Sequence, residues 1–340
     1  MAQAPALRAT PAAAAAQPAA QPAAQPVDAL LRQLEWTVIR PLDGLLQGDW
    51  RTLWRGAGID LADLREYQHH DDVRHIDWNV TARLGQPHVR QFHEDRDLNA
   101  WFLLDVSPSV DFGSAGTTKL GVSCAFVAVL ARIITRHGNR VGALLYGDGV
   151  DAVLPPRASR LHVLELMRRM TAPRVHATQR TTALGELLRA ARGVIRRRSL
   201  IFVVSDFISE PGWADELARL ARRHDVVVVR LWDPLEKALP ADAGLGFVTL
   251  QDAETGEQFN VDLGDPGLLR RHAELAAAQE AALLDGLAGS GADTLELATD
   301  DDLLLTLMRF ADLRRQRARQ RSPRRLPAAL ARAQPAGAGR

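Results

Sequence analysis

The chain has 340 residues, with 42 Lys or Arg and 41 Asp or Glu, so its formal net charge is only +1. The charge is unevenly distributed: residues 313–340 carry nine Arg and no acid, whereas residues 28–312 carry a net charge of −9. An acidic body argues against a nucleic-acid-binding domain. The single cysteine, Cys124, excludes an intrachain disulfide and a cysteine-based zinc site, and it fits the reducing cytoplasm in which we expect the protein.

Both ends of the chain have the composition of flexible segments. In residues 1–27, 22 positions are Ala, Pro or Gln, which predicts a disordered leader and does not resemble a signal peptide. Residues 313–340 predict a flexible Arg-rich tail that could attract an anionic partner. No apolar run approaches the roughly 18–20 residues that a membrane helix needs, so we expect no membrane span.

Between these ends, the pattern of apolar and polar residues changes at residue 98. A helix is predicted over residues 27–46, broken at Pro41, and residues 48–97 read as irregular structure or short strands, so 28–97 is expected to be an N-terminal extension. Beyond it, strands are predicted at 100–105, 140–146, 150–154, 199–205, 225–232 and 294–298, and helices at 117–136, 160–170, 183–196, 213–224, 268–287 and 300–312. Apolar strands that alternate with helices predict an α/β domain over residues 98–312, with a parallel sheet covered on both faces. A hairpin around Thr255-Gly256 is expected to extend that sheet.

The sharpest motif is D-x-S-x-S at residues 105–109, where the first buried strand ends. Asp105, Ser107 and Ser109 supply hard oxygen ligands of the kind that Mg²⁺ or Mn²⁺ prefers. Thr182 precedes a predicted helix, with Thr181 as its rival, and Asp206 follows another apolar strand. Carboxyl ends of parallel strands share one edge of the sheet, so these five residues predict a metal site there. The alternative is that Asp105 and the serines only cap a helix.

This set of oxygens resembles the metal-ion-dependent adhesion site of von Willebrand factor A domains. A longer stretch, EYQHHDDVRHIDWNVTAR at residues 66–83, resembles the signature of the bacterial family called domain of unknown function fifty-eight, although His70 stands where that family has glycine. The resemblance implies a doubly wound von Willebrand A-like fold with Mg²⁺ or Mn²⁺ bound by Asp105, Ser107, Ser109, Thr182 and Asp206. It also implies a non-catalytic adaptor for a MoxR-type AAA+ ATPase in the maturation of client proteins. An acidic side chain of such a client could complete the coordination of the ion.

The signature segment has two interpretations. Its candidate functional residues are Tyr67, Asp71, Asp72, Arg74, Asp77, Trp78 and Arg83. We favour a structural role, in which the Arg and Asp side chains form an ion-pair cluster and Trp78 anchors the segment by burial, over direct contact with a partner. A transition-metal site from His69, His70, Asp71 and His75 is disfavoured, because neighbouring residues on an irregular segment seldom converge on one ion.

The sequence argues against enzyme functions on specific grounds. Residues 113–119 faintly resemble a phosphate-binding loop, but no glycine precedes Lys119 and Leu120 stands where Ser or Thr is needed. A G-x-S-x-G nucleophile motif is absent from the sequence. A metal-dependent phosphoesterase that uses the same Asp, Ser and Thr site is the alternative function, and we disfavour it because we expect no lysine near the strand ends.

Overall fold

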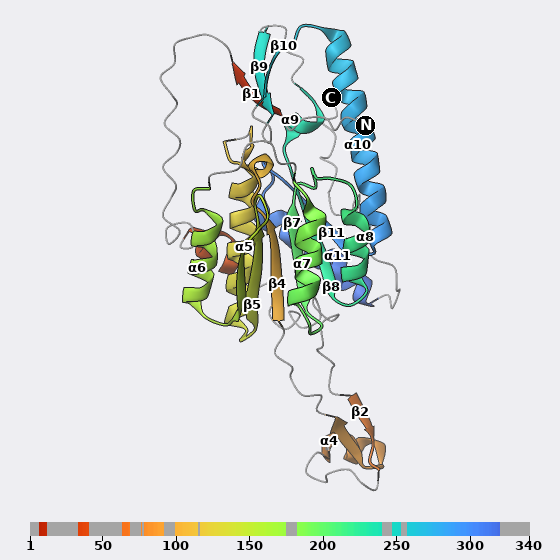
Figure 1. Cartoon of the computed structure of the whole chain (residues 1–340). Helices are drawn as coiled ribbons and strands as arrows, with labels where there is room; N and C mark the ends of the chain where they lie inside the picture. The colour runs from red at the N-terminus through yellow and green to blue at the C-terminus, as the bar shows by residue number, and fades with distance from the viewer. Residues whose placement is uncertain are drawn as a thin grey trace.

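The computed structural model describes residues 7–11, 33–40, 63–68, 76, 78–91, 99–114, 116–174, 182–239, 247–252 and 257–319. Its centre is a six-stranded sheet with the order β11-β8-β7-β4-β5-β6 (Figure 1). The strands are β4 (Asn99–Asp105), β5 (Arg140–Tyr146), β6 (Val150–Arg157), β7 (Leu200–Ser205), β8 (Asp225–Trp232) and β11 (Asp293–Ala298). Neighbouring strands run parallel except β5 and β6, which are antiparallel. The predicted α/β fold is therefore confirmed.

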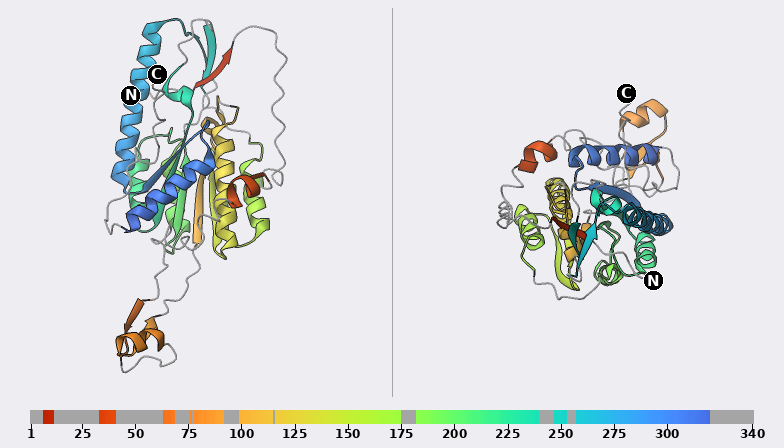
Figure 2. Two further views of the ribbon diagram at one scale, coloured as in Figure 1. Left: turned by 180° about the vertical axis from the view of Figure 1, so that it is seen from behind. Right: turned by 90° about the horizontal axis from the view of Figure 1, so that it is seen from above.

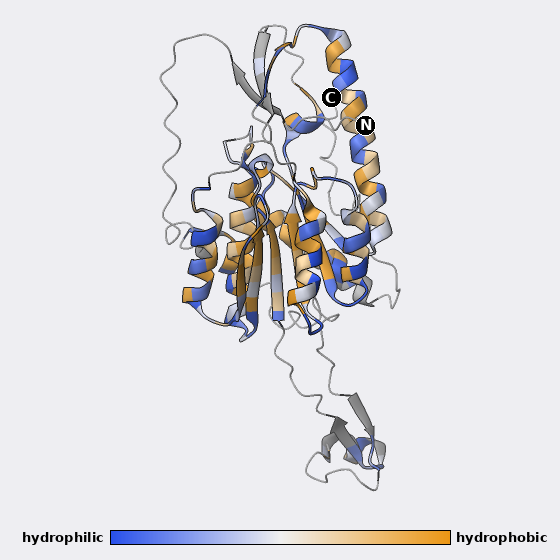
Figure 3. Ribbon diagram, viewed as in Figure 1, coloured by the Kyte–Doolittle hydropathy of each residue, from blue (hydrophilic) through white to orange (hydrophobic). Residues whose placement is uncertain are grey.

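Helices cover both faces of this sheet (Figures 1 and 2). One face carries α5 (Lys119–Arg136), α6 (Arg160–Met170), α11 (Leu303–Arg319) and the π-helical turn η1 (Glu35–Ile39), and the other carries α7 (Leu184–Val194), α8 (Trp213–Ala221) and α10 (Pro266–Ser290). Along β4, Phe102 and Leu104 belong to one apolar cluster while Trp101 and Leu103 belong to the other. Strand side chains alternate between faces, so a strand buried on both sides is apolar throughout, as Figure 3 shows.

The strand order places the predicted site at a switch point of the sheet topology. The chain leaves β4 toward β5 on one side and later returns to β7 on the other, so the connections diverge at the carboxyl ends of β4 and β7. Ligands of open α/β sheets bind at such a point. Asp105 is the last residue of β4 and Asp206 directly follows β7.

The outer edge of the sheet on the β5 side is β6, the strand that runs antiparallel to its neighbour. Pro155 and Pro156 lie in its second half, and neither has an amide proton for a further ladder. Its partner β5 carries Gly142, where an added Cβ would lie 2.9 Å from the Trp101 ring and 3.0 Å from the Leu154 carbonyl oxygen. Close packing between β5, β6 and Trp101 therefore requires glycine at this position.

The two ends of the chain differ from the predictions. The hairpin of β9 (Phe247–Asp252) and β10 (Gln258–Asp262) joins β1 (Leu7–Pro11) in a separate three-stranded sheet and does not extend the main one. Part of the leader expected to be disordered is thus a strand; the rest of it lies outside the described residues. At the other end α11 continues past residue 312 to Arg319, because Arg314 is anchored 2.9 Å from Asp225 and 3.5 Å from Asp293.

The signature segment forms a small unit of β2 (Asp63–Glu66), α4 (Trp78–Leu84) and β3 (His88–Gln91). The predicted burial of Trp78 is wrong: its exposed fraction is 70 %, and it is the first residue of a short helix that packs against β3. Arg83 is also exposed, and Tyr67 is half-buried with its amide donating to the Pro87 carbonyl at 2.8 Å. Asp71, Asp72, Arg74, Asp77 and the three histidines of the segment lie outside the described residues, so their ion-pair cluster stays a prediction. In the described part of the chain, no helix is long and apolar enough to cross a membrane.

Candidate metal centre

Asp105 is a fully buried carboxylate at the end of β4. Its Oδ1 accepts a hydrogen bond from the Ser107 amide at 3.0 Å, and its Oδ2 accepts one from the Ser205 hydroxyl at 2.6 Å. Burial, together with the negative charge of Asp206, raises the pKa of Asp105 to about 6. The two donors are neutral, so they orient the carboxylate without balancing its charge.

The serines of the motif present two hydroxyls side by side. Ser107 precedes the 3-10 turn η4 (Pro108–Asp111), yet its side chain makes no capping hydrogen bond, so helix capping does not explain it. The Ser107 and Ser109 Oγ atoms are buried and lie 3.1 Å apart. Neighbouring oxygens in the octahedral shell of Mg²⁺ are separated by about 3 Å, since each lies about 2.1 Å from the ion. The two hydroxyls therefore have the spacing of adjacent ligands.

Asp206 is paired with a lysine that the sequence analysis did not expect. The Lys119 side chain is fully buried, and its Nζ donates to Asp206 Oδ2 at 2.7 Å and to Glu236 Oε1 at 2.5 Å. Burial lowers the pKa of Lys119, but the two carboxylates outweigh this effect and the pKa is raised overall. The prediction of no lysine near the strand ends is wrong, because α5 follows β4 and so begins at the carboxyl edge of the sheet with Lys119 as its first residue.

The loop after β7 makes a tight turn that fixes Asp206. Its Oδ1 accepts a hydrogen bond from the Ile208 amide at 3.0 Å, and the Phe207 amide donates to the Ser205 hydroxyl at 2.9 Å. Phe207 has a φ of 61°, a left-handed conformation that residues other than glycine rarely adopt. Its buried ring packs edge-on against Trp213, with ring centroids 5.0 Å apart. This apolar contact offsets the backbone strain and holds the turn in place.

Glu236 is held in turn by the start of a short helix, α9 (Pro234–Lys237), which follows β8. Its Oε2 accepts from the Asp233 amide at 3.0 Å, and Asp233 Oδ1 accepts from the Leu235 amide at 3.0 Å, which together form a capping box. Asp233 is fully buried and also accepts from the Ser114 amide and hydroxyl, at 2.8 and 2.6 Å, and from Thr299 Oγ1 at 2.6 Å. Burial raises the pKa of Asp233, but these hydrogen bonds lower it by more. Asp233 thus ties three loops of the carboxyl edge together.

Thr182 lies on the same edge and is buried. Its carbonyl oxygen accepts hydrogen bonds from the Glu210 amide and the Ser209 hydroxyl, both at 2.9 Å, which join it to the loop after β7. The next amide, of Ala183, donates to the Tyr146 hydroxyl at the end of β5. The structure therefore brings Asp105, Ser107, Ser109 and Asp206 together and places Thr182 between the ends of β5 and β7. Its rival, Thr181, lies outside the described residues.

The composition of the cluster fits a hard divalent cation. Within the described ranges no three His, Cys, Asp or Glu side chains form a metal-binding group. The cluster offers two aspartates and the neighbouring hydroxyls of Ser107 and Ser109. Such oxygens suit Mg²⁺ or Mn²⁺ better than Zn²⁺. The carboxylates of Asp105, Asp206 and Glu236 and the ammonium of Lys119 together leave two negative charges when all are ionised. One divalent cation would neutralise them.

Sequence reasoning missed three members of this cluster: Lys119, Glu236 and Ser205. Two signals could have found Lys119, since the chain has only one other lysine and this one begins the helix after the D-x-S-x-S loop. Glu236 belongs to an Asp-Pro-Leu-Glu sequence after a strand, which has the spacing of a capping box. Ser205 stands next to Asp206, where a hydroxyl at a strand end can reach the neighbouring strand.

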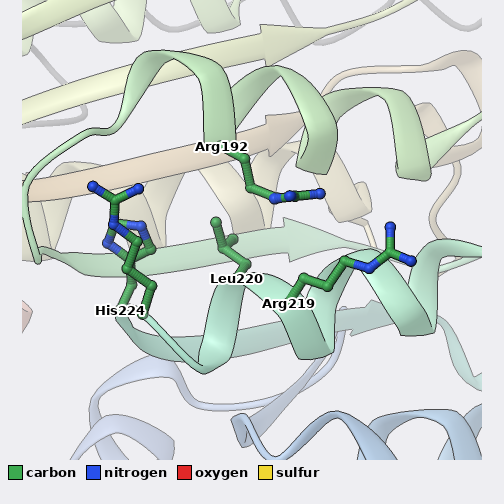
Figure 4. A pocket seen from close by; sticks show the side chains of 5 residues that line it. Arg192, Arg219, Leu220 and His224 are labelled. Atoms are coloured by element: carbon green, nitrogen blue, oxygen red, sulfur yellow. The ribbon is translucent and has the colours of Figure 1, made fainter.

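A hollow lies at the opposite edge of the sheet, where α7 and α8 end. It is lined by Arg192, Arg219, Leu220, Arg223 and His224 (Figure 4). Arg192 and Arg219 each donate to Glu216 at 2.7 Å. Arginines in the last turn of a helix offset the partial negative charge of its free carbonyls. We therefore interpret this hollow as a structural charge cluster.

Comparison with known proteins identifies the family. The family described as "Protein of unknown function DUF58" matches residues 63–282. Uncharacterised proteins of Mycobacterium bovis (Mb1516) and Mycobacterium tuberculosis (Rv1480) are 39% identical over 291 residues, which cover 85% of this chain and 90% of theirs. The chain belongs to the DUF58 family. The predicted resemblance to this family is confirmed, and the mostly parallel sheet between two helical layers is the doubly wound α/β arrangement that the resemblance implied.

Solved structures with lower similarity to this DUF58 chain include BatB from Bacteroides thetaiotaomicron, at 13% identity and a TM-score of 0.41, covering 64% of this chain and 99% of that one. The von Willebrand A domain of SpRpn10 aligns at 13% identity and a TM-score of 0.35, covering 63% of this chain and 95% of that one.

Proposed function

We propose that this DUF58 protein is a non-catalytic module that binds an acidic side chain of a client protein through Mg²⁺ or Mn²⁺. Asp105, Ser107, Ser109, Thr182 and Asp206 would hold the ion. The main support is the pair of buried hydroxyls 3.1 Å apart beside a carboxylate whose charge is not balanced. A bound cation supplies that balance, together with a coordination position that a foreign carboxylate can fill.

Hydrogen bonds within the protein orient the two aspartates of this site without a bound ion. The Ser107 amide and the Ser205 hydroxyl orient Asp105, and the Ile208 amide and Lys119 orient Asp206. The low-dielectric surroundings strengthen each charge interaction at the site relative to bulk water.

Metal binding is tested by calorimetric titration of Mg²⁺ and Mn²⁺ into the wild type and into Asp105→Ala. We expect saturable binding by the wild type and a loss of at least tenfold in affinity for the variant. Asp285→Asn, which neutralises an exposed carboxylate on α10, is the control and should bind both ions as the wild type does. Equal binding by Asp105→Ala and the wild type would remove the site.

We further propose that the module serves a MoxR-type AAA+ ATPase, as the family resemblance implies. The test is size-exclusion chromatography of the purified protein with the purified MoxR-type ATPase of the same organism, with Mg²⁺ or with a chelator. A complex that forms with Mg²⁺ and is absent for Asp105→Ala supports a metal-dependent contact. A complex that resists the chelator would place the contact elsewhere on the module.

The alternative function, a phosphoesterase, gains little from the lysine at the site. Lys119 Nζ already donates to two carboxylates and its side chain is fully buried, so the ammonium is not accessible for direct contact with a phosphate. We therefore expect no turnover of p-nitrophenyl phosphate with Mg²⁺ or Mn²⁺. Turnover that Asp105→Asn abolishes would instead favour the phosphoesterase.

A further inference from the structure

We propose that Lys119 is a positioning residue that keeps Asp206 from binding the metal ion strongly and so leaves the ion more attractive to a partner's carboxylate. This inference rests on the proposed metal-dependent function and adds to it a residue that sets the balance between metal affinity and partner affinity. Its basis is a fully buried ammonium in direct contact with one of the candidate ligands.

Both oxygens of Asp206 already have partners on the protein. Oδ2 accepts from Lys119 Nζ at 2.7 Å and Oδ1 accepts from the Ile208 amide at 3.0 Å. Asp105 differs, because its two donors, the Ser107 amide and the Ser205 hydroxyl, are neutral. The two aspartates are therefore not equivalent: the Lys119 ammonium, which is shared with Glu236, offsets part of the charge of Asp206, while the hydrogen bonds to Asp105 come from neutral groups.

Lys119 cannot easily swing away from Asp206. Its Nζ is also bonded to Glu236, whose other oxygen accepts from the Asp233 amide within the capping box of α9. Asp233 is buried and is fixed in turn by Ser114 and Thr299. The Lys119 amide donates to the Phe112 carbonyl at 2.8 Å, which anchors the start of α5 as well. This chain of contacts makes the ammonium a fixed charge.

A fixed positive charge beside the site affects metal binding and partner binding in opposite directions. It repels an incoming divalent cation and withdraws electron density from Asp206, and both effects lower metal affinity. An ion held at this site would receive less charge from Asp206 than from Asp105. It would therefore attract a carboxylate from another protein more strongly than an ion held by two aspartates without such a neighbour.

A purely structural role for Lys119 makes a different prediction. If the lysine only held the loops together, removing either partner of the Lys119–Glu236 pair would disturb the site and weaken metal binding. If its charge matters, the two removals act in opposite directions, because one deletes a positive charge and the other deletes a negative one. The sign of the change in metal affinity separates the two roles.

The test measures Mg²⁺ and Mn²⁺ affinity by calorimetry for the wild type, Lys119→Met and Glu236→Gln. We expect affinity to rise at least tenfold for Lys119→Met and to fall at least fivefold for Glu236→Gln. Lys237→Met is the matched control, because Lys237 forms the neighbouring pair on α9, with Glu280 at 2.9 Å, and should leave metal affinity within twofold of the wild type. Circular dichroism confirms that each variant is folded.

A second measurement tests how strongly the metal-loaded protein binds a carboxylate, with acetate as the probe. Binding of acetate to the Mn²⁺-loaded protein, monitored by water-proton relaxation, should be weaker for Lys119→Met than for the wild type. Should Lys119→Met fail to fold, acetate binding to Mn²⁺-loaded Glu236→Gln separates the two roles, since the side chain is 18% exposed and the change is isosteric. The charge role predicts tighter acetate binding by this variant than by the wild type, and weaker or unchanged acetate binding would overturn the inference. Weaker or unchanged metal binding by Lys119→Met, or tighter binding by Glu236→Gln, would overturn the inference. No metal binding by the wild type would instead overturn the proposed function itself.

Discussion

Replacing Asp105 with Asn measures how much the buried negative charge of this carboxylate destabilises the metal-free protein. Its pKa rises from 3.8 to about 6 on folding, through burial and the charge of Asp206. At about 1.4 kcal/mol for each pKa unit, this corresponds to about 3 kcal/mol that disfavour the charged form in the folded protein. The folded state binds the Asp105 proton more tightly than the unfolded state does. The contribution of this proton to the free energy of unfolding is therefore fully present below pH 3.8 and is lost as the pH rises through about 6.

Asn is a suitable replacement at this position. Its amide oxygen can still accept from the Ser107 amide, and the Ser205 hydroxyl can turn to accept from its amino group. We therefore expect metal-free Asp105→Asn to be more stable than the metal-free wild type by about 1–3 kcal/mol at pH 8 and by little at pH 4. Added Mg²⁺ should stabilise the wild type and have no effect on the variant.

The assay is urea unfolding at pH 4 and pH 8, with a chelator and with Mg²⁺, for the wild type, Asp105→Asn and the exposed control Asp285→Asn. The control should follow the wild type under every condition. A metal-free Asp105→Asn that is no more stable than the wild type at pH 8 would show that the charge of Asp105 is already balanced within the protein. The cluster would then have no need of a cation.

Three further predictions concern the surrounding fold. Asp233→Ala leaves the Ser114 donors and the buried Thr299 hydroxyl without their acceptor, so the free energy of unfolding should fall by about 3 kcal/mol. An effect below about 1 kcal/mol would contradict the role given to Asp233. A chain that ends after Asp312 loses the Arg314 ion pairs and should melt at a lower temperature than a chain that ends after Arg319; equal melting temperatures would show that the pairs add nothing. Burial raises the pKa of Cys124 to about 12, so its thiol should stay unreactive toward a disulfide reagent at pH 8 until urea unfolds the protein.

The main sheet could be predicted because its strands are buried on both faces. Runs such as 200–205 and 225–232 are almost entirely apolar, and short apolar runs separated by helices are typical of the central strands of a parallel sheet. Asp105 and Asp206 could be placed at one edge for a related reason, since parallel strands end together. The position of the site therefore follows from local sequence and topology.

The charge partners of the site could not be predicted in the same way. Lys119 and Glu236 are 117 positions apart, and nothing in either local sequence states that their side chains meet. Trp78 was expected to be buried because large aromatic residues usually are, but its helix has too few neighbours to cover it. The strand formed by residues 7–11 is specified by pairing with β9, more than 230 positions away, and its own Ala- and Pro-rich composition does not favour a strand.

The two consecutive prolines of β6 also restrict how this molecule can associate with others. An outer strand normally offers a row of unpaired amides to which a foreign peptide or a second molecule can add by backbone hydrogen bonds. Pro155 and Pro156 interrupt that row on this side of the sheet. The addition of a foreign strand is therefore disfavoured along the second half of β6, which also protects this edge of the sheet against aggregation.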